Sequence, residues 1–445
     1  MRHTIVLASM SSMGHVNPMR PIARALVDRG HDVRWYTGEP YRRTVEATGA
    51  RFVPMTPQSD PDAPPPAKGG MASFRYGFKH VFLDPAPGHV ADLLRLAADE
   101  PFEVLVAEFG VLGARMFHEL TGVPWVSVGV SPLTSPSRDT APFGLALPPN
   151  ATPLGRLRNR ALNAYLDRVL LREVRAYRTM IRARVGLPPD RRPLLAGTVS
   201  PLLHLQTGVR ELEYPRSDMP PQLHFVGGLV DPANAEPRPA WAAEVERATV
   251  PVVHVTQGTV ADADLDALVR PTLRALADEP VLVVAGTGRN DPATLGPLPP
   301  NARVAPFVPH GWLLPHTDVM VTNGGFGAVQ AALAHGVPLV VAGASEDKPE
   351  VAARVAWAGV GVNLRTGTPS PDQVRDAVRA VLADGRYAHL AADLRDVYAG
   401  LDAGEESAAL IEALADTRQP VTHRWPRVGR YASAGARVSG TMTAA

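Results

Sequence analysis

Short apolar runs alternate with amphipathic helical segments along most of this chain, and the alternation limits its fold more than any other feature. The helical segments repeat apolar residues at spacings of three and four, as at 18–29, 111–120 and 265–276. The apolar runs form two series, at 4–8, 32–36, 103–107 and 125–130, and then at 252–255, 281–285, 304–307, 319–322 and 339–341. Strands that alternate with helices pair in parallel and are covered by helices on both faces. The sequence therefore predicts an α/β protein with two doubly wound, Rossmann-like parallel-sheet domains facing a central cleft.

A proline-rich segment separates the two series. The chain has 445 residues, and at roughly 150 residues per domain this length suggests two or three domains. Residues 231–239 combine prolines with acids and fit neither a helix nor a central strand. We predict an N-terminal domain over 1–228, a linker over 229–246, a C-terminal domain over 247–416 and a disordered tail over 417–445.

The composition excludes several classes of protein. The chain has 45 basic and 44 acidic residues, for a net charge of +1, which argues against a nucleic-acid partner. It has no cysteine, so disulfides, thiolate nucleophiles and cysteine-bound metals are excluded and a reducing cytoplasm fits. No segment approaches the roughly 18 apolar residues that a membrane span requires. We expect a cytoplasmic protein that acts on small molecules, as a monomer or a homodimer.

A glycine cluster follows the predicted strand 319–322 and opens a helix. The cluster reads Asn323-Gly324-Gly325-Phe326-Gly327-Ala328. Glycine lets the backbone approach a ligand closely, and the free N–H groups of a helix start favour an anion such as a diphosphate. We expect a Cβ at Gly325 to intrude on the ligand or to strain a φ that only glycine adopts. A tight turn with no ligand is an equal alternative.

Other loops are predicted to lie at the same sheet edge. Gly258 and Thr259 follow the first strand of the second series, Gly286-Thr287-Gly288 follows the next strand, and Phe307, Val308 and His310 follow the third. Ligands of doubly wound sheets bind at the carboxyl ends of the strands, so these loops indicate a nucleotide site. The rest of a dinucleotide fingerprint is missing around Gly286, so NAD is not expected.

The order of these motifs resembles a known family. The C-terminal half is similar to the donor domain of GT-B glycosyltransferases through Phe307-Val308-Pro309-His310, Asn323-Gly324-Gly325, Gly336-Val337-Pro338, Glu346-Asp347-Lys348 and Gly359-Val360-Gly361-Val362. The N-terminal Gly14-His15-Val16-Asn17-Pro18 resembles the start of bacterial macrolide and antibiotic glycosyltransferases. The likeness covers most of residues 1–415.

The resemblance implies an activity for each domain. The N-terminal domain would bind a lipophilic acceptor such as a polyketide, an aromatic natural product or a flavonoid. The C-terminal domain would bind a UDP- or dTDP-sugar. A nucleophile of the acceptor would attack the anomeric carbon with inversion, and the nucleoside diphosphate would leave without help from a metal or cofactor.

His15 and Glu108 are the candidate catalytic residues. His15 lies in the turn after the first strand, and an imidazole is basic near neutral pH, as a general base must be. The alternative is a histidine that makes a local hydrogen bond at a helix start. In the family an Asp follows the fourth strand and orients the base, and Glu108, one methylene longer, stands at that place. An exposed acid at a strand end is the alternative for Glu108.

The donor site departs from the family pattern at several positions. Asn323 stands where the family usually has His, Ala328 replaces Ser or Thr, and Ala331 replaces a Glu that holds the ribose. Phosphate binding would then depend on the backbone N–H groups of 325–328 and on the helix dipole. The family's Asp-Gln pair, which binds the sugar, is here Asp347-Lys348. Lys348 has two alternatives, a phosphate or acidic sugar as ligand, or an ion pair with Glu346 or Glu350.

The sequence leaves two alternative functions and a possible metal site to consider. Asp262 and Asp264 resemble a metal-binding Asp-x-Asp, but Asp is favoured at a helix start as a cap, so we predict no catalytic metal. A non-catalytic nucleotide-sugar-binding helper protein is the first alternative function, favoured by Asn323, Ala328 and Glu108. The second is a nucleotide-sugar epimerase, which shares the fold but not the loop around His15.

Overall fold

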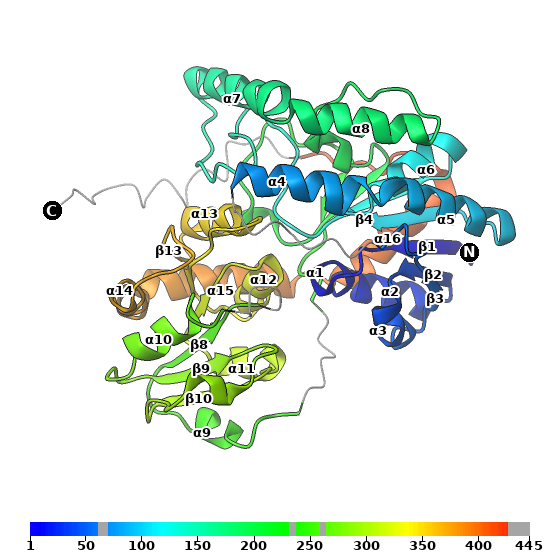
Figure 1. Ribbon diagram of the computed structural model, residues 1–445. Helices are drawn as coiled ribbons and strands as arrows, with labels where there is room; N and C mark the ends of the chain where they lie inside the picture. The colour runs from blue at the N-terminus through cyan, green and yellow to red at the C-terminus, as the bar shows by residue number, and fades with distance from the viewer. Residues whose placement is uncertain (61–69, 231–236, 259–263, 426–445) are drawn as a thin grey trace.

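The computed structural model describes residues 1–60, 70–230, 237–258 and 264–425, which form two α/β domains (Figure 1). The N-terminal sheet is all parallel, in the order β3-β2-β1-β4-β5-β6-β7. Its strands are β1 (Thr4–Ala8), β2 (Asp32–Thr37), β3 (Arg51–Pro54), β4 (Val104–Glu108), β5 (Trp125–Gly129), β6 (Leu203–Gln206) and β7 (Leu223–Phe225). The C-terminal sheet is also parallel, in the order β10-β9-β8-β11-β12-β13. Its strands are β8 (Val252–Thr256), β9 (Leu282–Gly286), β10 (Ala302–Ala305), β11 (Val319–Thr322), β12 (Leu339–Val341) and β13 (Gly361–Asn363). The predicted fold class is confirmed.

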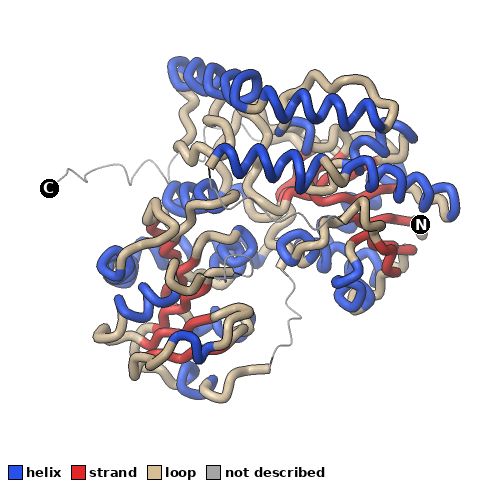
Figure 2. The backbone as a smooth tube through the Cα atoms, in the orientation of Figure 1, coloured by secondary structure: helices blue, strands red, loops and turns tan. Residues whose placement is uncertain are grey.

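Helices flank both sheets (Figure 2). Those between the N-terminal strands are α1 (Met13–Val16), α2 (Met19–Asp28), α3 (Arg42–Glu46), α4 (Met71–Gly77), α5 (Ala86–Asp99), α6 (Gly113–Thr121), α7 (Pro153–Tyr165) and α8 (Arg172–Arg184). The later helices are α9 (Ala242–Glu246), α10 (Val269–Ala275), α11 (His310–Leu313), α12 (Phe326–Ala334), α13 (Lys348–Ala358), α14 (Pro371–Ala383), α15 (Gly385–Ala399) and α16 (Ala403–Thr417). Within the described ranges, no helix is long and apolar enough to cross a membrane.

The packing of β1 explains why apolar runs in the sequence predict strands. Ile5 and Leu7 point into one buried cluster and Val6 and Ala8 into another, on the opposite face of the sheet. A strand that is covered on both faces is apolar at every position, since alternate side chains point to opposite sides. Strands whose residues are almost all apolar were predicted for this reason. The strands β3, β6, β7 and β13 were missed because each is short and includes a polar residue.

The C-terminal helix α16 packs on the other domain. Ala408, Ile411 and Leu414 are buried in the same cluster as Met19 and Ile22 of α2, and Figure 1 shows α16 beside the N-terminal strands. The sequence-based boundary at 416 assigned this helix to the C-terminal domain, because a helical pattern shows an apolar face but not the sheet that covers it.

The two segments expected to lack structure are partly ordered. In the segment predicted as a linker, α9 buries Val245 in a cluster with Trp312. In the segment predicted as a tail, the Val421 N–H donates to the Leu202 carbonyl at 3.0 Å, and Trp425 Nε1 donates to the Pro220 carbonyl at 2.9 Å. The remaining tail, 426–445, lies outside the described residues.

Candidate active site

The structure brings His15 and Glu108 together. His15 lies in the short helix α1 after β1, and Glu108 is the last residue of the adjacent strand β4. His15 Nδ1 is 2.7 Å from Glu108 Oε2, and the carboxylate is fully buried while the imidazole is one-fifth exposed. The Met10 and Gly110 N–H groups donate to Oε1 and Oε2 of Glu108 at 3.0 and 2.8 Å. A carboxylate only accepts hydrogen bonds, so Nδ1 carries the proton and the Nε2 lone pair is left to act as a base.

Charges from both domains act on His15. Burial by itself lowers the pKa of His15, but the charge and hydrogen bond of Glu108 and the charges of Asp347 and Glu346 outweigh it, so the pKa is raised above 6.5. Asp347 begins the helix α13 of the C-terminal domain. The charge of Asp347 therefore reaches the predicted base from the other domain.

Aromatic side chains that the sequence analysis missed surround this pair. The ring centroids of Phe109 and Phe82 lie 5.7 and 6.4 Å from that of His15. A cavity beside Glu108 is lined mainly by apolar side chains, which include Phe78, Leu83, Phe109, Leu112 and Met116, and also by Arg115, Arg178 and Arg182. One sequence signal was available, because Phe109 follows Glu108 directly and Phe78 and Phe82 are four residues apart.

The glycine cluster joins two loops at the carboxyl edge of the C-terminal sheet. Asn323 is buried; its Nδ2 donates to the Gln257 carbonyl and its Oδ1 accepts the Gly325 N–H at 3.3 Å. Gly258 lies beside it, since a Cβ built there would be 3.7 Å from Asn323 Oδ1. The amide of Asn323 therefore fastens neighbouring loops, and α12 begins directly after them.

The expectation that a side chain at Gly325 would strain the backbone is wrong. Its φ is −57°, which any residue adopts, and a Cβ there would meet only Asn323 Oδ1, at 3.8 Å. Gly324 is the constrained residue, because its φ is +87° and a Cβ would lie 2.8 Å from Val341 Cγ1. Open space above Gly325 leaves the first-turn N–H groups of Phe326, Gly327 and Ala328 accessible to a ligand.

Substitution of Gly325 by Ala tests whether a diphosphate lies on this turn. We expect the dissociation constant of UDP or dTDP to rise at least about tenfold, because the new Cβ occupies the space that the phosphate would use. The melting temperature should stay unchanged, because the backbone of Gly325 suits alanine. Gly324→Ala is the contrasting variant, with a lowered melting temperature. Calorimetry that finds unchanged nucleotide affinity for Gly325→Ala would place the phosphate elsewhere.

The other predicted donor-site residues have different surroundings. Val308 and Phe326 pack in buried clusters, so only their backbones are open to a donor, whereas Phe307 is half-exposed. Burial lowers the pKa of His310 to about 4, and its ring lies 5.4 Å from that of His254, so both histidines are neutral. Thr259 lies outside the described residues.

Only one residue of the Asp347-Lys348 pair is available to bind a sugar. Lys348 is buried and its Nζ pairs with Glu346, as one of the two alternatives anticipated. Burial raises the pKa of Asp347, although the charge of Lys348 opposes this shift. Asp347 is thus the member of the pair with free acceptor capacity for sugar hydroxyls.

No candidate metal centre is found in the part of the chain that the structure describes. Asp262, which prompted the metal alternative, is among the undescribed residues. Asp264 Oδ1 accepts the Asp266 N–H at 2.9 Å, a local turn contact of the kind expected for a structural aspartate.

Comparisons with known proteins show the family of this chain. The profile described as "Erythromycin biosynthesis protein CIII-like, C-terminal domain" matches residues 271–414. The 4'-demethylrebeccamycin synthase of Lentzea aerocolonigenes is 48% identical over 420 residues, which span 92% of this chain and 99% of that enzyme. The chain is a GT-B glycosyltransferase of the EryCIII-like family. Its sequence resemblance to antibiotic glycosyltransferases is thereby confirmed.

Another curated relative and a solved structure are also similar to this glycosyltransferase over most of their length. UDP-glycosyltransferase 2 of Phaeomoniella chlamydospora is 36% identical, with 92% of this chain and 95% of that protein covered. The crystal structure of the kitacinnamycin glycotransferase superposes with a TM-score of 0.73 at 25% identity, covering 93% of this chain and 98% of the other. The enzyme uses a nucleotide sugar and acts in natural-product chemistry, which sets aside the helper-protein and epimerase alternatives.

Proposed function

We propose that this glycosyltransferase transfers a sugar with inversion from a UDP- or dTDP-sugar to a nucleophile on a lipophilic small molecule, without a metal ion. The observation that carries the proposal is the 2.7 Å contact of His15 Nδ1 with the buried carboxylate of Glu108, where the charge of Asp347 from the other domain also acts. In the reaction, His15 Nε2 takes the proton of the acceptor nucleophile as that atom bonds to the anomeric carbon. The bond from the anomeric carbon to the diphosphate oxygen breaks, and the electron pair leaves with the nucleoside diphosphate.

The leaving group would be stabilised by the start of α12. Its first-turn N–H groups and the positive end of its dipole lie beyond Gly325, next to the loop at Gly258. Asn323 is neutral and bonded to the protein on both sides of its amide, so it adds no charge to the site. Phosphate recognition would therefore depend on the backbone, as the departure from His at this position predicts.

The acceptor is proposed to be a planar or aromatic natural product. The apolar wall next to Glu108 and the rings of Phe82 and Phe109 beside His15 favour such a molecule. The 48% identical relative is named for the synthesis of 4'-demethylrebeccamycin. The aglycone of that compound is the first acceptor to try.

A donor and acceptor panel tests the proposal. UDP-glucose and dTDP-glucose are each incubated with this aglycone, with a flavonoid and with a macrolide, in the presence and absence of EDTA, and products are detected by mass spectrometry. We expect a hexose added to at least one aromatic acceptor at a rate that EDTA does not change. Loss of activity on chelation, or hydrolysis of the donor without transfer, would contradict the proposal.

Substitution of Glu108 by Gln tests the orienting role. The charge of Glu108 raises the pKa of His15, so its removal should lower that pKa and move the acid limb of the kcat/KM profile to lower pH. The rate at the plateau should also fall, because Gln can hold the wrong tautomer of the imidazole. Glu103→Gln, which removes a half-exposed carboxylate one strand-length away, is the control. An unshifted acid limb in Glu108→Gln would remove Glu108 from the mechanism.

A further inference from the structure

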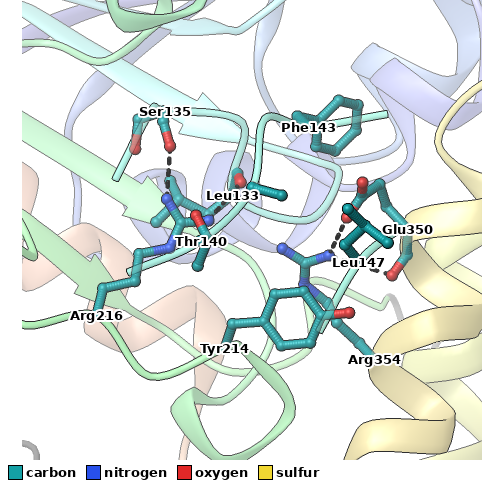
Figure 3. Close-up of a pocket in the computed structure, with 10 residues that line it drawn as sticks. Leu133, Ser135, Thr140, Phe143, Leu147, Tyr214, Arg216, Glu350 and Arg354 are labelled. Carbon is teal, nitrogen blue, oxygen red and sulfur yellow. Dashed lines mark hydrogen bonds and ion pairs between the residues drawn. The ribbon is translucent and has the colours of Figure 1, made fainter. Parts of the chain in front are cut away.

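A buried charged network links the two domains away from His15. Arg354 of α13 donates through Nη2 and Nε to Glu213 of the N-terminal domain, at 2.7 and 3.1 Å. Its Nη1 donates to Glu350 Oε2, one turn earlier on α13, at 2.7 Å. The guanidinium also lies 4.3 Å from the ring centroid of Tyr214. Figure 3 shows Arg354, Glu350 and Tyr214 lining a pocket together with Phe143 and Leu147.

The second oxygen of Glu350 binds a loop of the N-terminal domain. The N–H groups of Gly144 and Ala146 both donate to Glu350 Oε1, each at 2.7 Å. Ala146 has a φ of +51°, a conformation that non-glycine residues adopt only when their surroundings impose it. The loop that contains them, 131–152, follows β5 and shows no helix or strand. The buried carboxylate of Glu350 therefore satisfies two N–H groups of this loop near Ala146, whereas Arg216 holds its start through the Leu133 and Ser135 carbonyls.

The loop and the helix each reach a different part of the active site. Phe143, next to Gly144, packs against the buried cluster that contains Phe78, and Phe82 of the same cluster neighbours His15. Glu350 lies three residues after Asp347, within the first turn of α13. Glu350 thus connects the loop that packs on the aromatic cluster near His15 with the helix that begins after Asp347.

We propose that Glu350 is a positioning residue, which fastens the 131–152 loop to the helix that begins at Asp347. This contact fixes the position of the acceptor wall relative to the donor-sugar site. The inference rests on the proposed roles of Asp347 and of the wall beside Glu108. Glu350 touches neither reactant. It acts through the Gly144 and Ala146 amides on one side and through the first turn of α13 on the other.

Hydrogen exchange tests the contact, and kinetics tests its consequence. In Glu350→Gln the amide can no longer accept from the loop and from Arg354 with two oxygens, so exchange of the Gly144 and Ala146 amides should accelerate at least about tenfold. The acceptor KM should rise about tenfold, whereas the dissociation constant of UDP or dTDP should change by less than about twofold. Glu350→Asp keeps the charge beside Arg354 but is too short to reach both amides. It should retain the wild-type melting temperature and still show faster loop exchange.

Asp372→Asn is the matched control, since it removes one carboxylate from an exposed ion pair with Arg375 in the same domain. It should leave loop exchange and acceptor KM unchanged. Wild-type exchange at Gly144 and Ala146 in both Glu350 variants, or a wild-type acceptor KM in a variant whose loop does exchange faster, would overturn the proposal while leaving the transferase function intact. If the wild-type enzyme transferred no sugar at all, the proposed function itself would fail, and this inference with it.

Discussion

His15→Ala is expected to lower kcat by about 10²–10⁴-fold, the usual loss when a positioned general base is removed. The affinity for UDP or dTDP should change by less than about twofold, because His15 belongs to the N-terminal domain and the turn proposed to bind the diphosphate belongs to the C-terminal one. Initial rates at saturating donor and acceptor, together with calorimetry of the nucleotide, measure the two quantities separately.

The control for this variant is His389→Ala. His389 is four-fifths exposed on α15 and is not among the groups whose charges act on His15, so its loss should not alter the rate. Turnover of His15→Ala near the wild-type rate would show that another group accepts the proton. Loss of nucleotide binding in the same variant would show that His15 supports the fold of the site instead.

Arg354→Met is expected to give the largest loss of stability, about 3–5 kcal/mol in the free energy of unfolding. Glu213 and Glu350 are buried and would lose their shared countercharge, although Arg216 stays 3.5 Å from Glu213. Chemical denaturation followed by circular dichroism measures the loss. Arg386→Met, at an exposed ion pair with Asp384, should leave the same free energy nearly unchanged, because water screens exposed ion pairs.

The loss should depend on pH in a defined direction. Burial raises the pKa of Glu213, but Arg354 and Arg216 outweigh it and hold the pKa below its ordinary 4.5 in the folded protein. A carboxyl with a lowered folded-state pKa stabilises the fold above its unfolded pKa, and this contribution is lost as the pH falls through the folded-state value. The difference between wild type and Arg354→Met should therefore be largest near neutral pH and shrink below about pH 4.5. A difference that stays constant from pH 7 to pH 4 would mean that lost packing, not charge, causes the effect.

Most of the fold was predictable from the local pattern of apolar residues. The runs at 4–8 and 319–322 were recognisable because each strand is covered on both faces, and the glycine cluster after 322 marked the ligand edge of its sheet. The position of α16 was not predictable in the same way. Its apolar face is plain in the sequence, but only the folded chain shows that Ile411 packs on the first domain and not on the second.

Some residues of the candidate site were predictable from sequence and others were not, for the same reason. His15 was predicted from its place in the turn after the first strand, and Glu108 from the family resemblance, which puts an acid after the fourth strand. The structure brings the two together because β1 and β4 are adjacent parallel strands. The constraint on Gly324 was assigned to Gly325, because sequence does not show which glycine of a run takes the positive φ. Glu350 gave no sequence signal as a site residue, since its partners, Gly144 and Ala146, are backbone amides some two hundred residues away.

The stereochemistry of the product tests the central claim most directly. The claim is that His15 deprotonates the acceptor for a single in-line displacement at the anomeric carbon. Transfer from the α-linked donor UDP-glucose or dTDP-glucose to an aromatic acceptor should then give only the β-glycoside, identified by the proton coupling of the anomeric position in NMR, and His15→Ala should form none above background. An α-glycoside, which needs retention at that carbon, or a β-glycoside formed equally fast by His15→Ala, would contradict the account.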